Sequence, residues 1–180
     1  PGRLRVRTDV RKSPSSCPPG GHSCRWISSG PMTSFISEGG SAFSHVVAVA
    51  EKGKIIAGAI HLPALEKTYV AVIGESATCN GEAIAVSERG AIEGATVLSA
   101  RANLLPEHWN GSPPEIDRTF RSSLAYRMAL VADGRFDAML TFRDAWEWDV
   151  AAGVLMVEAA GGIATGGKGE ALRFNNPHPQ

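Results

Sequence analysis

The sequence lacks any apolar run approaching the roughly 20 residues that a membrane-spanning helix needs. Its first 25 residues contain no apolar stretch like that of a secretory signal peptide. An excess charge of one sign is also lacking, because 18 Lys and Arg residues balance 18 Asp and Glu residues. Only three of the 180 residues are cysteines, an odd number that argues against a disulfide framework. We therefore expect a cytoplasmic protein with reduced thiols, no integral membrane segment and no nucleic-acid partner.

The charge balance conceals a basic N-terminal segment. Residues 1–25 contain six basic side chains and one acidic side chain, for a net charge of +5, and 19 of residues 1–40 are Gly, Pro or Ser. Such a composition cannot bury enough apolar surface to offset the entropy lost on ordering the chain. We therefore predict an irregular or disordered segment over residues 1–33 and one domain over residues 34–180. Because the chain begins with Pro1 instead of Met, we expect a fragment or a processed product.

From residue 44 onward, apolar runs alternate with turn residues. Three runs predict an antiparallel meander of strands, over residues 44–51, 54–62 and 68–73. Further expected elements are an Asn80-Gly81 turn, a strand over 96–100, a loop over 103–117, a helix over 122–133, a strand over 135–142 and a helix over 149–160. The mixture of strands and helices predicts an α+β fold.

The clearest functional signal lies at the start of the last predicted helix. Asp149 follows two tryptophans and a glutamate, and among the eleven residues after it only Glu158 is charged. A carboxylate at the first turn of a buried helix is favoured by the free backbone N–H groups and by the helix dipole. Two interpretations stay open at this point: a helix cap without chemistry, and a carboxylate that takes part in catalysis.

Three segments resemble one enzyme family. Trp148–Gly153 (W-D-V-A-A-G), running into Glu158–Gly162 (E-A-A-G-G), is similar to the C-terminal signature of the inositol monophosphatase family. Ser122–Asp137 and Ser44–Ala71 resemble other parts of that family, so the likeness extends over roughly residues 34 to 180. It implies the layered α-β-α-β-α sugar-phosphatase fold, of which only the C-terminal part and the end of the first sheet are present. Without the N-terminal helices, that first sheet is expected to be exposed, with poor solubility as the consequence.

The resemblance also implies an activity. Members are lithium-sensitive hydrolases of phosphoric monoesters that use Mg²⁺, and Asp149 matches an aspartate that binds the metal. Ser122 and Ser123 are implied to contact a small phosphorylated substrate, and we further expect a homodimer. The segments Leu124–Arg127 and Glu147–Asp149 are similar to one branch, the 3'(2'),5'-bisphosphate nucleotidases. The expected substrate is therefore such a nucleotide or an inositol monophosphate.

The family's other metal signature, D-P-[IL]-D-G-T, is poorly matched. Pro31 and Met32 fit its second and third positions, and Thr33 fits its phosphate-contacting threonine, but Gly30 replaces the first aspartate and the second aspartate is missing. This departure supports a second reading, a non-catalytic fragment that lacks the N-terminal metal ligands, and we expect little activity from this chain itself.

The composition of residues 1–33 suggests why the signature is missing, because it is typical of a G+C-rich coding region read out of frame. Back-translating residues 26–33 and shifting the frame gives D-L-V-G-P-D-D, which is closer to the signature. The nucleotide sequence of the gene tests this hypothesis.

Overall fold

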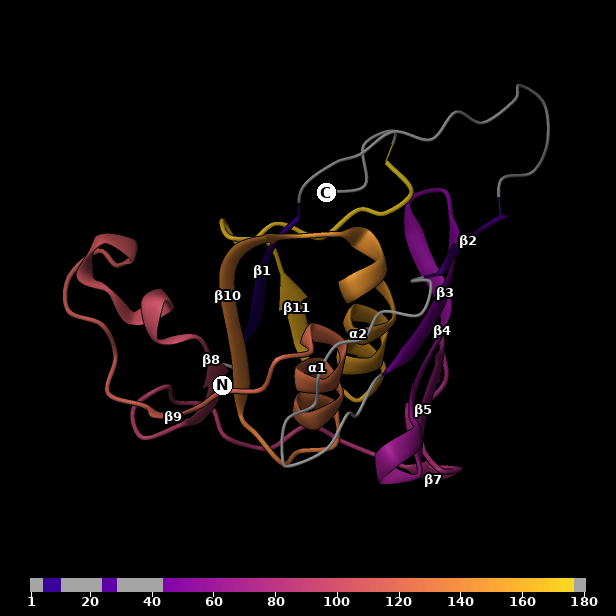
Figure 1. Cartoon of the computed structure of the whole chain (residues 1–180), viewed down its shortest axis with the longest axis horizontal. Helices are drawn as coiled ribbons and strands as arrows, with labels where there is room; N and C mark the ends of the chain where they lie inside the picture. The colour runs from indigo at the N-terminus through magenta and orange to yellow at the C-terminus, as the bar shows by residue number, and fades with distance from the viewer. Residues whose placement is uncertain (1–4, 11–23, 29–43, 177–180) are drawn as a thin grey trace.

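Two β-sheets enclose a pair of helices. The computed structural model describes residues 44–176 in full and the backbone course of residues 5–10 and 24–28. Helices α1 (Leu124–Ala132) and α2 (Glu147–Ala159) lie between the sheets, so that the layers follow the order β-α-β (Figure 1). The predicted α+β class is confirmed. No helix in the described part of the chain is long and apolar enough to cross a membrane.

One of the two sheets is parallel. Its strand order is β11 (Ile163–Thr165), β1 (Arg5–Val10), β10 (Ala138–Ala145), β8 (Thr96–Ser99) and β9 (Asp117–Thr119). Each strand pairs in parallel with its neighbour. Since ligands of parallel sheets bind beyond the carboxyl ends of the strands, the end of β10 is the place to look for a site.

The other sheet is the predicted antiparallel meander. It contains, in order, β2 (Cys24–Ser28), β3 (His45–Glu51), β4 (Lys54–Leu62), β5 (Lys67–Val72), β6 (Thr78–Cys79) and β7 (Glu82–Ala83). All of its pairings are antiparallel. The Asn80-Gly81 turn is confirmed, because both residues have positive φ and join β6 to β7.

Part of the segment predicted to be irregular contains strands. Arg5–Val10 inserts between β10 and β11, and Cys24–Ser28 pairs with β3. Backbone hydrogen bonds to a neighbouring strand do not require apolar side chains, which is why composition missed these two strands. The remaining residues of the predicted segment lie outside the described residues, and a domain boundary at residue 33 stays a prediction.

Several element boundaries differ from those predicted. Short 3₁₀ helices occupy Pro63–Leu65, Arg101–Leu104 and Pro106–His108, two of them inside or at the edge of the predicted loop. Strand β10 starts three residues later than predicted, because residues 133–137 close α1. There the backbone N–H groups of Arg135 and Phe136 donate to the carbonyl oxygen of Leu130, and Gly134 has a φ of 70°.

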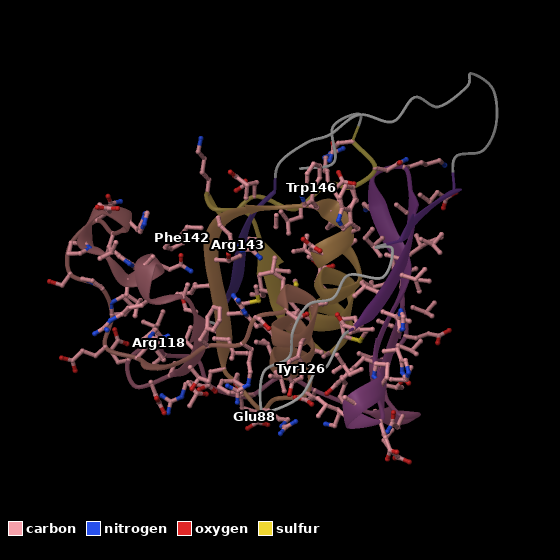
Figure 2. All side chains as sticks on the ribbon, in the orientation of Figure 1. Glu88, Arg118, Tyr126, Phe142, Arg143 and Trp146 are labelled. Carbon is pink, nitrogen blue, oxygen red and sulfur yellow. The ribbon has the colours of Figure 1, made fainter. Side chains whose placement is uncertain are left out.

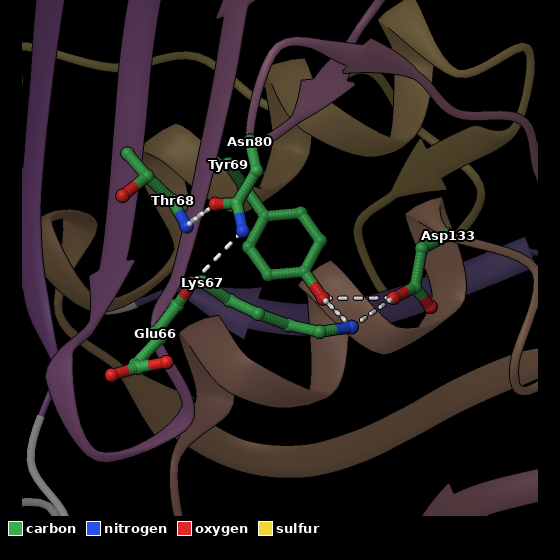
Figure 3. A network of polar contacts seen from close by, with 6 residues as sticks. All are labelled: Glu66, Lys67, Thr68, Tyr69, Asn80 and Asp133. Carbon is green, nitrogen blue, oxygen red and sulfur yellow. Dashed lines mark hydrogen bonds and ion pairs between the residues drawn. The ribbon is translucent and has the colours of Figure 1, made fainter.

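A polar network fixes the far end of α1 to the meander (Figure 3). The buried Tyr69 hydroxyl donates to Asp133 Oδ2 at 2.7 Å, and Lys67 Nζ lies 3.6 Å from the same oxygen. Burial and the hydrogen bond to Asp133 raise the pKa of Tyr69, so the phenol stays protonated. The network thereby fixes the C-terminal end of α1 and orients the whole helix, including its N-terminal end.

The meander also has an apolar face turned away from the helices. Val70 is 40% exposed, while Tyr69 and Ala71, on either side of it in the sequence, are buried. Such a face is typical of a sheet that packs against a further layer. The poor solubility expected from the sequence stays a prediction.

The helices approach each other closely at Gly153. A Cβ atom at this position would lie 2.7 Å from the Cβ and 2.6 Å from the Sδ of Met128 on α1. Replacing Gly153 by Ala therefore forces the two helices apart. Close packing of α2 against Met128 thus explains why the W-D-V-A-A-G segment ends in a glycine.

We expect Gly153→Ala to lower the melting temperature. The overpacking cost, about 1–3 kcal/mol, outweighs the gain of roughly 1 kcal/mol that Ala normally brings to a helix interior. The loss should be smaller in a Met128→Ala background, where the clashing atoms are absent, and a double-mutant cycle measured by thermal unfolding checks this coupling. A higher melting temperature for Gly153→Ala would contradict the packing explanation.

Candidate functional site

Both helices begin toward the same edge of the parallel sheet. A short turn joins α1 to β10, and Trp146 alone joins β10 to α2, so both helices run opposite to β10 (Figure 1). Their N-terminal ends therefore point toward the edge where β10 finishes. Free N–H groups and the positive ends of two helix dipoles favour anions at this edge.

Asp149 lies in the first turn of α2, but it does not open the helix. The helix begins at Glu147, and the N-cap residue is Trp146, whose side chain makes no capping hydrogen bond. The predicted start at residue 149 is therefore wrong, and Asp149 is not the N-cap residue, although a hydrogen bond with the backbone of Trp146 favours its charged form. The indole rings of Trp146 and Trp148 stack at 4.6 Å between centroids, which orders the chain ahead of Asp149 and extends the helix upstream.

Glu147 is a buried carboxylate whose role is structural. It is 1% exposed, and its Oε2 accepts a hydrogen bond from the backbone N–H of Asn175 at 2.6 Å. Its Oε1 accepts from the backbone N–H of Asn176 at 3.1 Å and from the side-chain amide of Asn176. These bonds fix the C-terminal segment against the start of α2, so Glu147 is already fully engaged.

Asp149 is electrostatically different from its neighbour. It is half-buried, and burial raises its pKa, while Arg143 acts in the opposite direction. Among the described residues, no hydrogen bond joins its carboxylate to Ser122 or Ser123. Asp149 is therefore a carboxylate kept at some cost to stability, as is common for functional groups.

The two predicted serines have different surroundings. Ser123 is the N-cap of α1: its Oγ accepts from the backbone N–H of Tyr126 at 3.2 Å and lies 3.5 Å from Ser44 Oγ. Ser122 Oγ is buried and has no hydrogen-bond partner. Ser123 is thus occupied as a helix cap, and the hydroxyl without a partner belongs to Ser122. Thr33, the third predicted substrate contact, lies outside the described residues.

Arg127 was not expected at the site. Although charged, it is only 3% exposed, its Nε donates to the carbonyl oxygen of Arg121, and its Nη2 donates to that of Ser122 at 3.3 Å. Its guanidinium carbon lies 4.6 Å from the centroid of the Phe120 ring. Burial and the nearby charge of Arg143 lower the pKa of Arg127 to about 10. The guanidinium stays charged at neutral pH and holds the segment that carries Ser122.

The described residues supply one candidate metal ligand, not a set. No group of three or more His, Cys, Asp and Glu side chains arranged for a metal ion occurs in the described part of the chain. Mg²⁺ is usually held by one or two carboxylates together with water and substrate phosphate. Asp149 suits that chemistry, but the adjacent charge of Arg143 opposes a cation. The fit to Mg²⁺ is therefore incomplete with these residues alone.

A cavity of about 530 Å³ lies at the other end of α2. Apolar side chains such as Ile55, Leu155 and Phe174 line it, and its charged residues are Lys54, Glu75 and Glu158. Two carboxylates against one ammonium group disfavour a phosphate there. The candidate site is therefore the edge that contains Asp149, Ser122 and the two arginines.

Comparisons with known proteins agree with the resemblance. Residues 33–179 match the model of the inositol monophosphatase family. The chain is 34% identical over 125 residues to the fructose-1,6-bisphosphatase/inositol-1-monophosphatase of Thermotoga maritima, covering 68% of this chain and 48% of that relative. It is 33% identical over 137 residues to the inositol-1-monophosphatase of Rhizobium meliloti, covering 71% and 50%.

A solved structure gives the same picture. The extragenic suppressor protein SuhB from Bartonella henselae superposes with a TM-score of 0.60 at 30% identity, covering 71% of this chain and 53% of that one. The chain thus spans about half the length of the relatives that it matches.

We expect Asp149→Asn to stabilise the fold at neutral pH. The folded-state pKa of Asp149 lies above its unfolded value of 3.8, so the folded state binds the proton more tightly. Ionisation of Asp149 therefore lowers the stability of the fold as the pH rises from 3.8 through the folded-state pKa, and the full cost is present above that pKa. Thermal unfolding should show a higher melting temperature for the variant at pH 7, and the gain should shrink below pH 3.8. An equal gain at both pH values would mean that burial of the charge is not responsible.

Proposed function

Because the chain belongs to the inositol monophosphatase family, we propose that it carries part of the active site of a Mg²⁺-dependent phosphatase that hydrolyses a small phosphate monoester. The observation that supports this most directly is Asp149, a half-buried carboxylate inside the matched W-D-V-A-A-G segment at an anion-favouring edge. Burial makes its charged form costly, and the charge of Arg143 and a hydrogen bond with the backbone of Trp146 offset only part of that cost, because its pKa is still raised. Binding a metal ion would account for a charged carboxylate at a position where burial disfavours the charge.

The candidate residues have two kinds of proposed role, metal binding and substrate binding. Asp149 is one ligand of the metal, and Ser122, Ser123 and Thr33 contact the substrate. A bound Mg²⁺ would polarise the phosphoryl oxygens and lower the pKa of an attacking water. Because the described residues supply one ligand only, the further ligands must come from outside them. The substrate is a 3'(2'),5'-bisphosphate nucleotide or an inositol monophosphate. A homodimer, a cytoplasmic location and the absence of a nucleic-acid partner stay predictions.

For the purified 180-residue chain we expect weak Mg²⁺ binding and no phosphate release above background. Each missing anionic ligand weakens the hold on a cation that gives up water reluctantly, and positioning supplies most of the rate in phosphoryl transfer. Calorimetry measures Mg²⁺ binding. Release of phosphate from adenosine 3',5'-bisphosphate and from inositol 1-phosphate, with and without Li⁺, measures activity.

Two variants make this test specific. Asp149→Asn should abolish the weak Mg²⁺ binding, whereas Glu158→Gln, which removes an exposed acid from the same helix, should leave it unchanged. Equal effects of both variants would remove Asp149 from the proposed ligand set. Mg²⁺-dependent, Li⁺-inhibited release that Asp149→Asn abolishes would show that this chain alone is a complete enzyme.

A further inference from the structure

The cavity of about 530 Å³ beside the C-terminal half of α2 is enclosed by segments that are distant in the sequence. They are the start of β4, the turn after β5 and the C-terminal segment. Backbone hydrogen bonds hold them in place: the N–H of Phe174 donates to the carbonyl oxygen of Gly53 at 3.0 Å, and that of Ala77 donates to Ala159 at 3.4 Å. The cavity is therefore built by the tertiary fold and not by one local segment.

This cavity is separate from the edge that contains Asp149. Trp146, labelled in Figure 2, marks the N-terminal end of α2, whereas Glu158, which lines the cavity, lies in the last turn of the helix. Glu158 follows Asp149 by nine residues, which in an α-helix amounts to about 14 Å along the axis and half a turn around it. A ligand in the cavity therefore binds independently of the candidate site.

The wall of the cavity is mainly apolar. Val154 and Leu155 lie three and four residues before Glu158, the spacing at which side chains share one face of a helix. Ile55 and Phe174, both buried, line the cavity from the meander and from the C-terminal segment. The volume is in the range of small-molecule sites, about 300–1,000 Å³. The wall therefore suits an apolar body such as an aromatic ring.

The charged groups of the cavity are unequal in sign. Glu75 and Glu158 contribute two carboxylates, and Lys54 contributes one ammonium group. None of the three forms an ion pair or a side-chain hydrogen bond within the part of the chain that the structure describes. Glu158 reaches solvent, yet partial burial raises the pKa of its carboxyl, and no neighbouring charge counteracts this. The excess negative charge, together with the negative end of the helix dipole, favours a cation.

We propose that this cavity binds a small amphipathic amine, with its apolar body against Leu155 and Phe174 and its ammonium group beside Glu158. The body removes apolar surface of the wall from water, and the ammonium group supplies the counter-charge that Glu158 lacks. A neutral molecule of the same shape gains only the burial. An anion of the same shape meets two carboxylates, and a bare metal ion gains nothing from the apolar wall.

Three ligands with one indole body test the proposal. Calorimetry with the 180-residue chain compares tryptamine, tryptophol and indolepropionate, which carry an ammonium, a hydroxyl and a carboxylate group. We expect tryptamine to bind most tightly and indolepropionate least tightly. Glu158→Gln should weaken tryptamine binding by about threefold to fivefold, the size of an ion pair near the surface, and leave tryptophol binding unchanged. Lys54→Gln removes the opposing cation and should not weaken tryptamine binding. Both side chains reach solvent, so circular dichroism should show an unchanged fold.

The matched control is Glu82→Gln. Glu82 is an exposed residue of β7 that does not line the cavity, so its replacement changes the net charge equally without touching the site. Equal losses for Glu82→Gln and Glu158→Gln, tryptophol binding as tight as that of tryptamine, or no tryptamine binding would each overturn the proposal. A loss of tryptamine affinity on Lys54→Gln would do the same. Asp149→Asn should leave tryptamine binding unchanged, so the proposal does not depend on the metal assignment.

Discussion

Helix α2 has almost no polar surface, and Glu158 is the one residue along its length that is exposed to solvent. A helix of this kind is stable only when both sides are covered, which here requires the meander on one side and the parallel sheet on the other. Small residues permit this close packing: Gly58 of β4 faces Ala152, and Gly153 faces Met128 of α1. The position of Asp149 follows, because the buried helix leaves its first turn at the sheet edge.

Much of this architecture was predictable from local patterns. The limits of β4 agree with prediction, and the meander, the Asn80-Gly81 turn and both helices are present. Boundaries differ where tertiary contacts decide them. Stacking of two indoles moves the start of α2 upstream, and bonds back to Leu130 delay β10. Strands β1 and β2 depend on neighbours far along the chain, and composition carries no information about such pairing.

The site was predictable only in part, for a physical reason. Asp149 and Ser123 could be found because a carboxylate or hydroxyl at a helix start is a local signal. Arg127 could not, since a lone charge within a helical pattern suggests a solvent-facing position, yet all nine residues of α1 are buried. Its partners are backbone carbonyl groups, which no residue type reveals. Arg143 is similar, because it influences the pKa values of Arg127 and Asp149 through space, which the order of residues along the chain does not reveal.

The bonds from Glu147 to Asn175 and Asn176 join residues almost thirty positions apart. A chain leaves the ribosome from its N-terminus, so α1, β10 and α2 emerge while this carboxylate still lacks its N–H donors. Burying it at that stage would leave a charge without hydrogen bonds, at a cost of several kcal/mol. The edge of the sheet that holds Asp149 is therefore completed late in synthesis, after the layers that support it.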